Sequence, residues 1–156
     1  MTLVAVSDAG PLIHLAEIDS LDFPSAFDAL VIPRTVYREL EEGGVPEGLS
    51  EVDHDLVTAE GDPSVTAELD PGETAALAVA NERDAILLTD DFAAREAATA
   101  ADVEVHGSLG IIALGYARGT LAREEAASLM RALQRETSLF VTDAVVERGI
   151  DLLDDR

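Results

Sequence analysis

Two short apolar runs that each end in aspartate constrain this chain more than any other feature. The run Leu3–Val6 leads to Asp8, and the run Ala85–Leu88 leads to Asp90 and Asp91. An unbroken apolar run bounded by polar residues is typical of a strand buried on both faces of a parallel sheet. In such a sheet, ligands bind in the crevice outside the carboxyl ends of the strands, where the strand order reverses. We therefore expect these acidic side chains to meet and form a site for a hard cation.

The rest of the chain alternates apolar runs with helical segments. Further strands are expected at Ala29–Ile32, His54–Thr58 and Val103–Val105. Strands separated by helices require right-handed crossovers and give a mostly parallel sheet covered on both faces, so the fold class is α/β. Helices are expected at residues 11–18, 20–28, 35–42, 70–83, 91–100, 110–118, 123–136 and 143–153, with a loop at 43–50.

Length and composition narrow the class of protein. A chain of 156 residues can bury a core of its own, so we expect a single domain over residues 1–156, with C-terminal helices from about residue 122. No apolar stretch approaches the roughly 20 residues that span a bilayer, and the first residues do not resemble a signal peptide. Cysteine is absent, which excludes disulfides, thiolate metal sites and cysteine nucleophiles. These features indicate a cytoplasmic protein with no membrane partner.

The charge is strongly negative. The formal net charge is −22, and all ten basic residues are arginine. An acidic balance usually argues against nucleic-acid partners, because phosphate binding relies on basic surface. In molar salt, however, the Debye length is about 3 Å, so surface carboxylates repel one another little. We interpret the composition as that of a halophile protein, in which net charge says little about the partner.

Each candidate acid also has a purely structural interpretation. Asp8 directly precedes a helix and suits an N-cap. Asp70 at the N-cap, Pro71 at N1 and Glu73 at N3 match a capping box, which favours a structural Glu73 over a catalytic one. Glu39 lies on a helix, where a solvated surface glutamate is the default. Together, however, several carboxylates without cysteine favour Mg²⁺ or Mn²⁺, ions that activate water and stabilise charge on a phosphate under attack.

The pair Asp90 and Asp91 leaves two assignments open. One of them is expected to cap the following helix, and Asp90 has the better claim to face the crevice. The hydroxyl of Thr89 could hold a carboxylate or a metal-bound water. His14 falls in an otherwise apolar helix, where a hydrogen-bonded buried histidine is favoured over a metal ligand.

Five segments, taken in order, resemble those of a known family. They are VSDAGPLIHLAEI, IPRTVYREL, LDPGETAALAVA, AILLTDDFAAREAA and VHGSLGIIALGYARG. This ordered set resembles one branch of the PIN-domain proteins, which are relatives of the VapC toxins. The resemblance runs from about Leu3 to Arg118. It implies a PIN-like three-layer α/β/α sandwich around a five-stranded, mostly parallel sheet.

The resemblance also implies a metal-dependent endoribonuclease, in which Mg²⁺ (or Mn²⁺) orients water against an RNA phosphodiester. The acidic positions of the family match Asp8, Glu39 and Glu73, with the fourth at Asp90 or Asp91. All five are candidate catalytic residues, and all except Glu39 are candidate metal ligands. Glu73 stands where many VapC proteins carry aspartate, and the segment after the second acidic strand is shorter than usual. One Glu73 side chain is not expected to cap a helix and bind metal at once.

The same resemblance implies partners. They are RNA, a second copy of the chain in a homodimer, and a small antitoxin protein if the chain is the toxin of a type II toxin–antitoxin pair. The cations available to grip phosphate include Arg34, Arg38, Arg95 and Arg118. The alternative is a catalytically inactive PIN-fold module with a regulatory or protein-interaction role. The enzyme is favoured because all four acidic positions are filled.

The charge predicts that stability depends on salt. We expect the protein to unfold or aggregate below about 0.5 M KCl, because its net charge of −22 is then less screened. Circular dichroism and light scattering across a KCl series would locate the transition. Equal stability in dilute buffer would contradict adaptation to molar salt.

Overall fold

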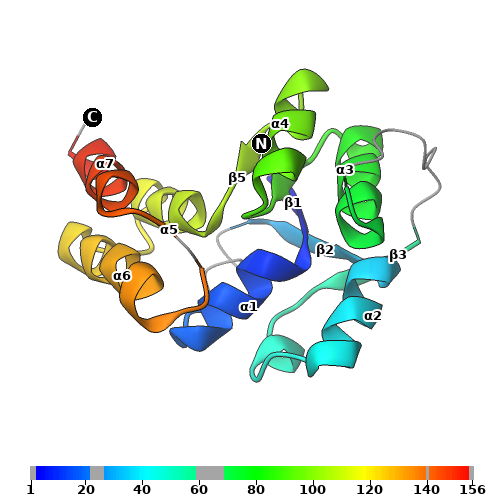
Figure 1. Cartoon of the computed structure of the whole chain (residues 1–156), viewed down its shortest axis with the longest axis horizontal. Coiled ribbons are helices and arrows are strands. Elements are labelled where there is room, and N and C mark those ends of the chain that lie inside the picture. Colours follow the sequence, from blue (N-terminus) through cyan, green and yellow to red (C-terminus); the bar gives the residue numbers. More distant parts are fainter. Residues whose placement is uncertain (1–2, 22–26, 59–68, 140, 155–156) are drawn as a thin grey trace.

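A parallel sheet of five strands forms the centre of the molecule, whose computed structural model describes residues 3–21, 27–58, 69–139 and 141–154. The strand order is β3-β2-β1-β4-β5, and every pair is parallel (Figure 1). The order reverses between β1 and β4, so these neighbours define the switch point of the sheet. The strands are β1 (Val4–Ser7), β2 (Ala29–Pro33), β3 (Asp55–Val57), β4 (Ile86–Leu88) and β5 (Val105–His106).

The two apolar runs that end in aspartate form the two central strands of the reversal. In β4 every residue is buried, and in β1 only Val4 is partly exposed. Val6 pairs with Leu87 and Ser7 with Leu88, so both strands end at the same level. The predicted α/β fold with a five-stranded parallel sheet is confirmed.

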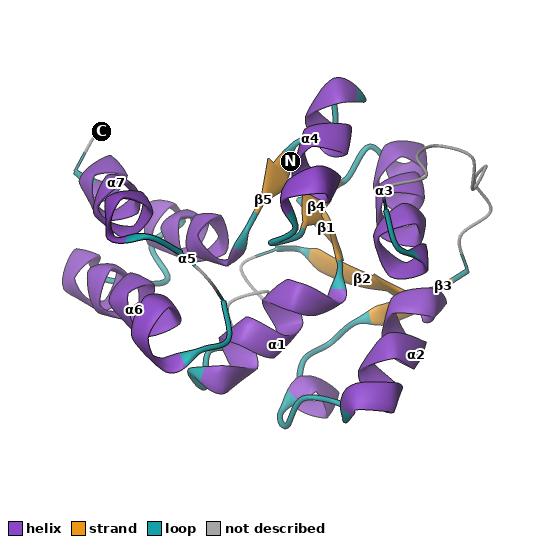
Figure 2. Cartoon of the chain, viewed as in Figure 1, coloured by secondary structure: helices purple, strands orange, loops and turns teal. Residues whose placement is uncertain are grey.

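Helices connect the strands and cover the sheet (Figure 2). Right-handed crossovers place the β1–β2 and β2–β3 connections on one face and the β3–β4 and β4–β5 connections on the other. Contacts between α1 and α2, and between α3 and α4, agree with this division. The helices are α1 (Ala9–Glu17), α2 (Arg34–Gly43), α3 (Pro71–Arg83), α4 (Phe92–Ala100), α5 (Ser108–Ala117), α6 (Arg123–Glu136) and α7 (Asp143–Leu153), with a 3-10 turn η2 (Leu49–Glu51).

The last three helices pack together beside the sheet. In Figure 1, α5, α6 and α7 form a group separate from the α3 side of the molecule, and α1 contacts both α5 and α6. Met130 and Leu133 of α6 are fully buried in this part of the core. None of the described helices is long and apolar enough to cross a membrane.

The structure moves some predicted boundaries for identifiable reasons. Helix α1 begins at Ala9, two residues earlier than predicted, because Asp8 caps it. Strand β5 begins two residues later than predicted, because the N–H of Val103 donates to Ala98 and closes α4 instead of pairing with β4. The helix predicted at residues 20–28 falls largely outside the described residues, and the described residues at its ends are not helical.

Three aspartates hold backbone conformations that usually favour glycine. Asp19, Asp84 and Asp102 have φ values of 52°, 55° and 58°, each directly after or close after the end of a helix. The left-handed turn at Asp84 allows the N–H of Ala85 to donate a hydrogen bond to the carbonyl of Ala80, which ends α3. Aspartate tolerates this region better than most residues, but its Cβ still makes it less favourable than glycine.

The left-handed turn after α3 predicts a stabilising substitution. Asp84→Gly should raise the free energy of unfolding by roughly 0.5–1 kcal/mol, because glycine adopts positive φ without the Cβ clash. Glu96→Gly removes the same charge from the exposed middle of α4 and should instead cost about 1 kcal/mol. Denaturant unfolding in 2 M KCl would compare them. A loss of stability in Asp84→Gly would show that the aspartate makes a compensating contact.

Candidate functional site

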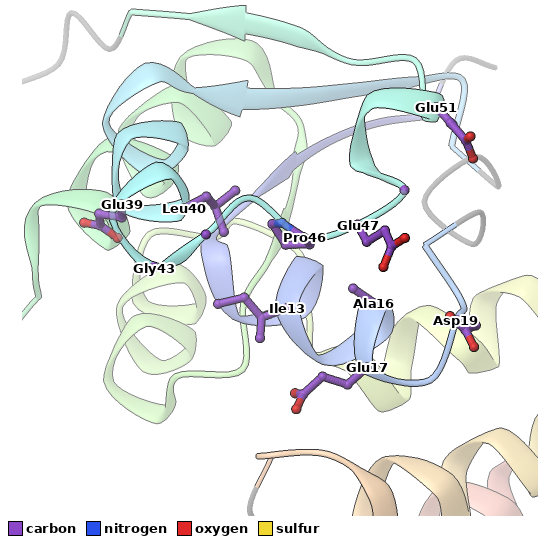
Figure 3. Close-up of a pocket in the computed structure, with 12 residues that line it drawn as sticks. Ile13, Ala16, Glu17, Asp19, Glu39, Leu40, Gly43, Pro46, Glu47 and Glu51 are labelled. Carbon is purple, nitrogen blue, oxygen red and sulfur yellow. The ribbon is translucent and has the colours of Figure 1, made fainter.

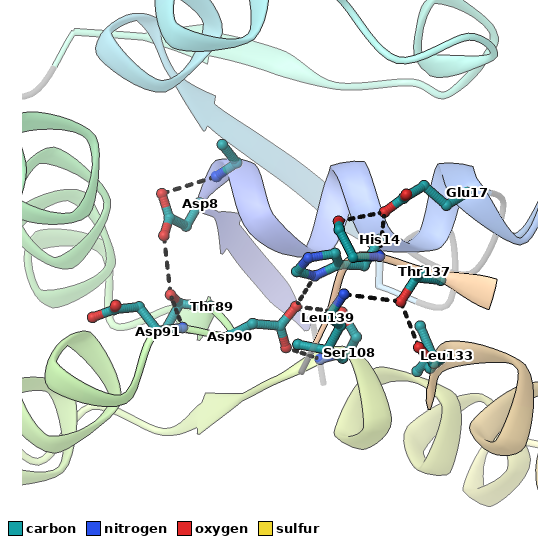
Figure 4. A network of polar contacts seen from close by, with 12 residues as sticks. Asp8, His14, Glu17, Thr89, Asp90, Asp91, Ser108, Leu133, Thr137 and Leu139 are labelled. Atoms are coloured by element: carbon teal, nitrogen blue, oxygen red, sulfur yellow. Dashed lines mark hydrogen bonds and ion pairs between the residues drawn. The ribbon is translucent and has the colours of Figure 1, made fainter. Parts of the chain in front are cut away.

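The carboxyl ends of β1 and β4 hold the centre of the candidate site. The backbone N–H of Asp8 donates to the carbonyl of Leu88 over 2.9 Å, which extends the pairing of the two strands by one residue. The Asp8 side chain is buried, with one oxygen accepting from the N–H of Ala9 (2.8 Å) and the other from the hydroxyl of Thr89 (3.0 Å; Figure 4). Asp8 thus takes the N-cap role that was one of its two interpretations, and Thr89 bonds a carboxylate, one of the two partners considered for it.

The same Thr89 hydroxyl brings Asp91 to the site. Its oxygen accepts from the backbone N–H of Asp91 over 3.2 Å, and Thr89 itself is fully buried. Asp91 is the N-cap of α4 and accepts from the N–H of Ala94 over 2.9 Å. One threonine therefore fixes Asp8 and the backbone of Asp91 in a common frame.

Glu73 reaches the site from the N-terminus of α3. The predicted capping box forms, with Glu73 accepting from the N–H of Asp70 (3.0 Å) and Asp70 accepting from the N–H of Glu73 (2.8 Å). The cap uses only Oε1 of Glu73; Oε2 makes no hydrogen bond among the described residues. The cap therefore leaves one carboxylate oxygen of Glu73 available, and each carboxylate oxygen can accept or ligate separately.

Glu39 approaches the same place from α2. Its Oε1 accepts from the backbone N–H of Gly72 over 2.9 Å, which ties α2 to the first turn of α3. A Cβ on residue 72 would lie 2.5 Å from Oε2 of Glu39, so a larger residue there would push the Glu39 carboxylate away. Glu39 is thus a half-buried acid that contacts another helix, and not the solvated surface residue expected by default.

The acids act on one another electrostatically. Burial, with added repulsion from Asp70 and Asp91, raises the pKa of Asp8 to about 6. Burial and repulsion from Asp70, Asp91 and Asp8 raise the pKa of Glu73 to about 7. Burial, Asp70 and Asp8 likewise raise the pKa of Glu39. We call Asp8, Glu39, Asp70, Glu73 and Asp91 the acidic cluster.

The acidic cluster fits a divalent cation in its chemistry but is not a preformed metal site. Its donors are all carboxylate oxygens, which Mg²⁺ and Mn²⁺ prefer, and no arginine is among the main causes of its pKa shifts. In the part of the chain that the structure describes, no three acidic or histidine side chains lie close enough together to hold a metal ion. The carboxylates must therefore approach one another before they can share a cation.

Asp90 belongs to a different network. Its Oδ1 accepts from the N–H of Ser108, and its Oδ2 accepts from the Ser108 hydroxyl and from Nδ1 of His14, each over 2.6 Å (Figure 4). Burial would raise the pKa of Asp90, but these hydrogen bonds hold it below its usual range. The structure does not bring Asp90 into the acidic cluster; it joins α1, α5 and the end of β4. His14 is the hydrogen-bonded, largely buried histidine that the sequence predicts.

Asp70 is the acid that sequence reasoning assigned only to a cap. Its charge raises the pKa of Asp8, Glu39 and Glu73, so it lies among them while it caps α3. The sequence does contain a signal for this position. Glu73 is the third residue of α3, so Asp70 at the N-cap of the same helix must lie close to it.

A pocket of about 510 Å³ opens on the α2 side of the acidic cluster (Figure 3). Its walls include Ile13, Leu40 and Pro46, and Glu39 connects it to the cluster. We call it the acidic pocket, because an anion placed there would meet carboxylates on several sides. Its acidic lining residues are Glu17, Asp19, Glu39, Glu47 and Glu51.

The four arginines proposed from the sequence lie in different places. Arg34 and Arg38 are exposed on α2, and Arg118 is exposed at the end of α5. Arg95 is exposed on α4, with Nη1 near Gly107. Among the described residues, none of these four forms an ion pair with a carboxylate.

Comparisons with known proteins agree with this architecture. The model of the DUF3368 family, described as a PIN domain, matches residues 4–155. A solved structure of a PilT N-terminus domain protein from the hyperthermophilic archaeon Sulfolobus solfataricus superimposes with a TM-score of 0.59. That alignment has 17% sequence identity and covers 70% of this chain and 90% of the other, so it supports the fold alone. No curated protein matches the chain in a sequence search.

The raised pKa values predict a pH dependence of stability without metal. The folded-state pKa of Asp8 is about 6 against 3.8 unperturbed, and that of Glu73 is about 7 against 4.5. At a pH between the unperturbed pKa and the folded-state pKa of either acid, the folded protein binds more protons than the unfolded chain. The free energy of unfolding should therefore fall as pH rises from about 4 to about 7. Denaturant unfolding with EDTA in 2 M KCl would measure the slope.

A matched pair of variants isolates the contribution of Asp8. Asp8→Asn should flatten the slope below pH 7, whereas Asp53→Asn removes the same charge from an exposed position and should leave it unchanged. Identical slopes in wild type and Asp8→Asn would show that Asp8 ionises at its ordinary pH.

Proposed function

The chain belongs to the PIN-domain family, a superfamily of nucleases, and from this premise we propose that it is a metal-dependent endoribonuclease. The observation that carries the proposal is the convergence of buried and half-buried carboxylates with raised pKa values at the switch point of the sheet. Active sites are where burial and like charges shift pKa values in this way. Ligands of open parallel sheets also bind at this position.

We assign the metal-holding role to Asp8, Glu73 and Asp91. Mg²⁺ or Mn²⁺ bound there would supply activation of water and charge stabilisation for hydrolysis of an RNA phosphodiester. The Thr89 hydroxyl contacts both Asp8 and Asp91, so it positions the Asp8 carboxylate and the backbone from which the Asp91 carboxylate extends. Glu73 keeps one oxygen on the helix cap and has the other available.

Glu39 and Asp70 support this set. Glu39 holds the first turn of α3 through Gly72, and Asp70 fixes the backbone of Glu73. Both also add negative charge, which favours the uptake of a cation and opposes the ionised, metal-free state. Asp90 is better suited to positioning the β4–α4 turn than to metal binding, because His14 and Ser108 already occupy both of its oxygens.

The resemblance to VapC toxins supports a more specific role within this proposal. The chain would act on RNA in the cytoplasm as the toxin of a type II toxin–antitoxin pair, as a homodimer and under control of a small antitoxin protein. Growth arrest on expression, relieved by Asp8→Asn, would support toxicity. Normal growth of cells that express an active ribonuclease would show that the chain is a ribonuclease but not a toxin.

A second candidate function is a PIN-fold interaction module without turnover. The observation that favours it is the lack of a preformed metal group among the described side chains. The two candidates differ in one measurable property, because the enzyme must bind a divalent cation at the acidic cluster and the module need not.

Metal binding separates the candidates. Titration calorimetry of Mn²⁺ at pH 7.5 in molar KCl should show binding to the wild type and a loss of at least about 10-fold in affinity in Asp8→Asn, since even outer-shell changes cost about 10–100-fold. Asp53→Asn is the matched charge control and should bind as the wild type does. Metal-dependent cleavage of RNA should likewise be reduced in Asp8→Asn and retained in Asp53→Asn. A folded wild type that binds no Mn²⁺ would favour the interaction module.

The two neighbouring aspartates should respond differently. Asp91→Asn should weaken Mn²⁺ binding with little loss of stability, whereas Asp90→Asn should mainly lower the free energy of unfolding, because it weakens the contacts with His14 and Ser108. Calorimetry and thermal unfolding of both variants would test this assignment. The reverse pattern would make Asp90 the fourth ligand.

A further inference from the structure

A second pocket, of about 420 Å³, opens between α4, α5 and α7. Asp90 borders it, and Phe92, the residue directly after Asp91, forms part of its wall. Phe92 is 73% exposed, and Val145 and Leu152, which also line the pocket, are 47% and 48% exposed. Large apolar groups exposed together around a hollow are typical of a binding surface.

Two arginines line the same pocket. Arg95 lies on α4, one turn after Phe92, and Arg148 lies on α7. Neither forms an ion pair within the described part of the chain. In a chain with 32 acidic residues and ten arginines, two unpaired arginines beside one apolar hollow are a local reversal of charge. We call this hollow the arginine pocket.

The position of Arg95 strengthens this charge reversal. Its Nη1 lies 3.3 Å from where a Cβ on Gly107 would be, and Gly107 is the N-cap of α5. A helix N-terminus carries partial positive charge, so the guanidinium lies beside a second positive group. Asp90 offsets part of this charge, but its oxygens are already shared by three donors. The arrangement favours an additional anion.

The acidic pocket and the arginine pocket therefore differ in the ligand that they suit. The acidic pocket joins the cluster through Glu39 and repels phosphate. The arginine pocket borders Asp90, and its wall includes Phe92, the residue directly after the proposed metal ligand Asp91. It offers an exposed aromatic face together with cations that suit a phosphate.

We propose that the arginine pocket binds a nucleobase of single-stranded RNA, with the base stacked on Phe92 and the adjoining phosphate at Arg95 and Arg148. The proposal rests on the ribonuclease function above and names the part of the substrate held beside the scissile bond. A base can reach Phe92 only when it is free of a duplex, so the pocket selects single strands. Stacking tolerates all four bases, so the site positions the strand without reading its sequence.

A second copy of the chain is the other occupant that this apolar surface could suit. Single-stranded RNA is favoured because Arg95 and Arg148 suit phosphate, and because Phe92 directly follows Asp91 of the acidic cluster. Oligomeric state is therefore one readout of the test.

The test compares a base-bearing strand with one that lacks bases. Fluorescence anisotropy would measure the binding of a labelled single-stranded oligoadenylate RNA, and of an abasic strand of equal length, in EDTA so that no metal-dependent cleavage occurs. Phe92→Ala should weaken binding of the oligoadenylate by about 5–150-fold, the range for loss of one stacked base, and leave the abasic strand unchanged. Phe92→Tyr should retain binding, because tyrosine keeps the stacking face.

The arginines have their own expected result and control. Arg95→Gln and Arg148→Gln should weaken both strands, because each removes a phosphate contact and not a base contact. Arg83→Gln removes an exposed arginine at the far end of α3 and should change neither. Circular dichroism would confirm that each variant is folded; Phe92 is mostly exposed, so its truncation leaves the core intact.

The outcomes separate this proposal from the ribonuclease. Equal affinity of wild type and Phe92→Ala for oligoadenylate, or no binding of either strand, would overturn the base pocket. Conversion of a dimer to a monomer by Phe92→Ala, with RNA affinity unchanged, would identify the surface as an interface and also overturn it. Base-dependent binding without metal-dependent cleavage would support the pocket and remove the ribonuclease function. Metal-dependent RNA cleavage that is unchanged in Phe92→Ala would support the ribonuclease function and overturn the base pocket.

Discussion

The hydroxyl of Thr89 is the contact on which the arrangement of the site depends. It donates to the carboxylate of Asp8 and accepts from the backbone N–H of Asp91, at the place where the sheet reverses its strand order. Both partners are fixed because β1 and β4 are parallel neighbours that end at the same level. A threonine that is fully buried can hold this position only if both its donor and its acceptor are satisfied, which the two aspartates achieve. The sheet thus brings together residues that are 83 positions apart in the sequence.

Four of the five members of the acidic cluster lie at the starts of helices, which lowers the cost of holding them together in the folded protein. Asp8, Asp70 and Asp91 are the N-caps of α1, α3 and α4, and Glu73 completes the box on α3. Each helix N-terminus offers N–H donors and partial positive charge to its own acid, which offsets some of the repulsion. Burial nevertheless dominates at Asp8 and Glu73, whose pKa values stay raised. Capping therefore does not exclude the proposed role of these residues in metal binding, because one carboxylate can serve both through its two oxygens.

This double use explains how far the sequence could predict the site. Unbroken apolar runs identified β1 and β4, and their final aspartates followed from strand position alone. Asp90 and Asp91 could not be separated, because the choice depends on His14 and Ser108, which reach Asp90 from α1 and α5. Asp70 was assigned only to a cap, since its proximity to Asp8 and Glu39 arises from the packing of α3 against α2 and β1. Sequence patterns predict which elements form, whereas the contacts between elements distant in sequence decide which side chain faces which.

A net charge of −22 looks incompatible with an RNA substrate, but the distribution of charge matters more than its sum. In molar salt, charges more than about 3 Å from a phosphate are largely screened, so contacts within the pocket dominate and distant carboxylates contribute little. The arginine pocket supplies such contacts through Arg95 and Arg148, and Phe92 adds stacking, which does not depend on net charge. The acidic pocket on the opposite side repels the same strand only at close range. An acidic protein of this kind would therefore bind RNA from one direction, along the arginine pocket toward Asp91, and would do so mainly through the base and its nearest phosphate.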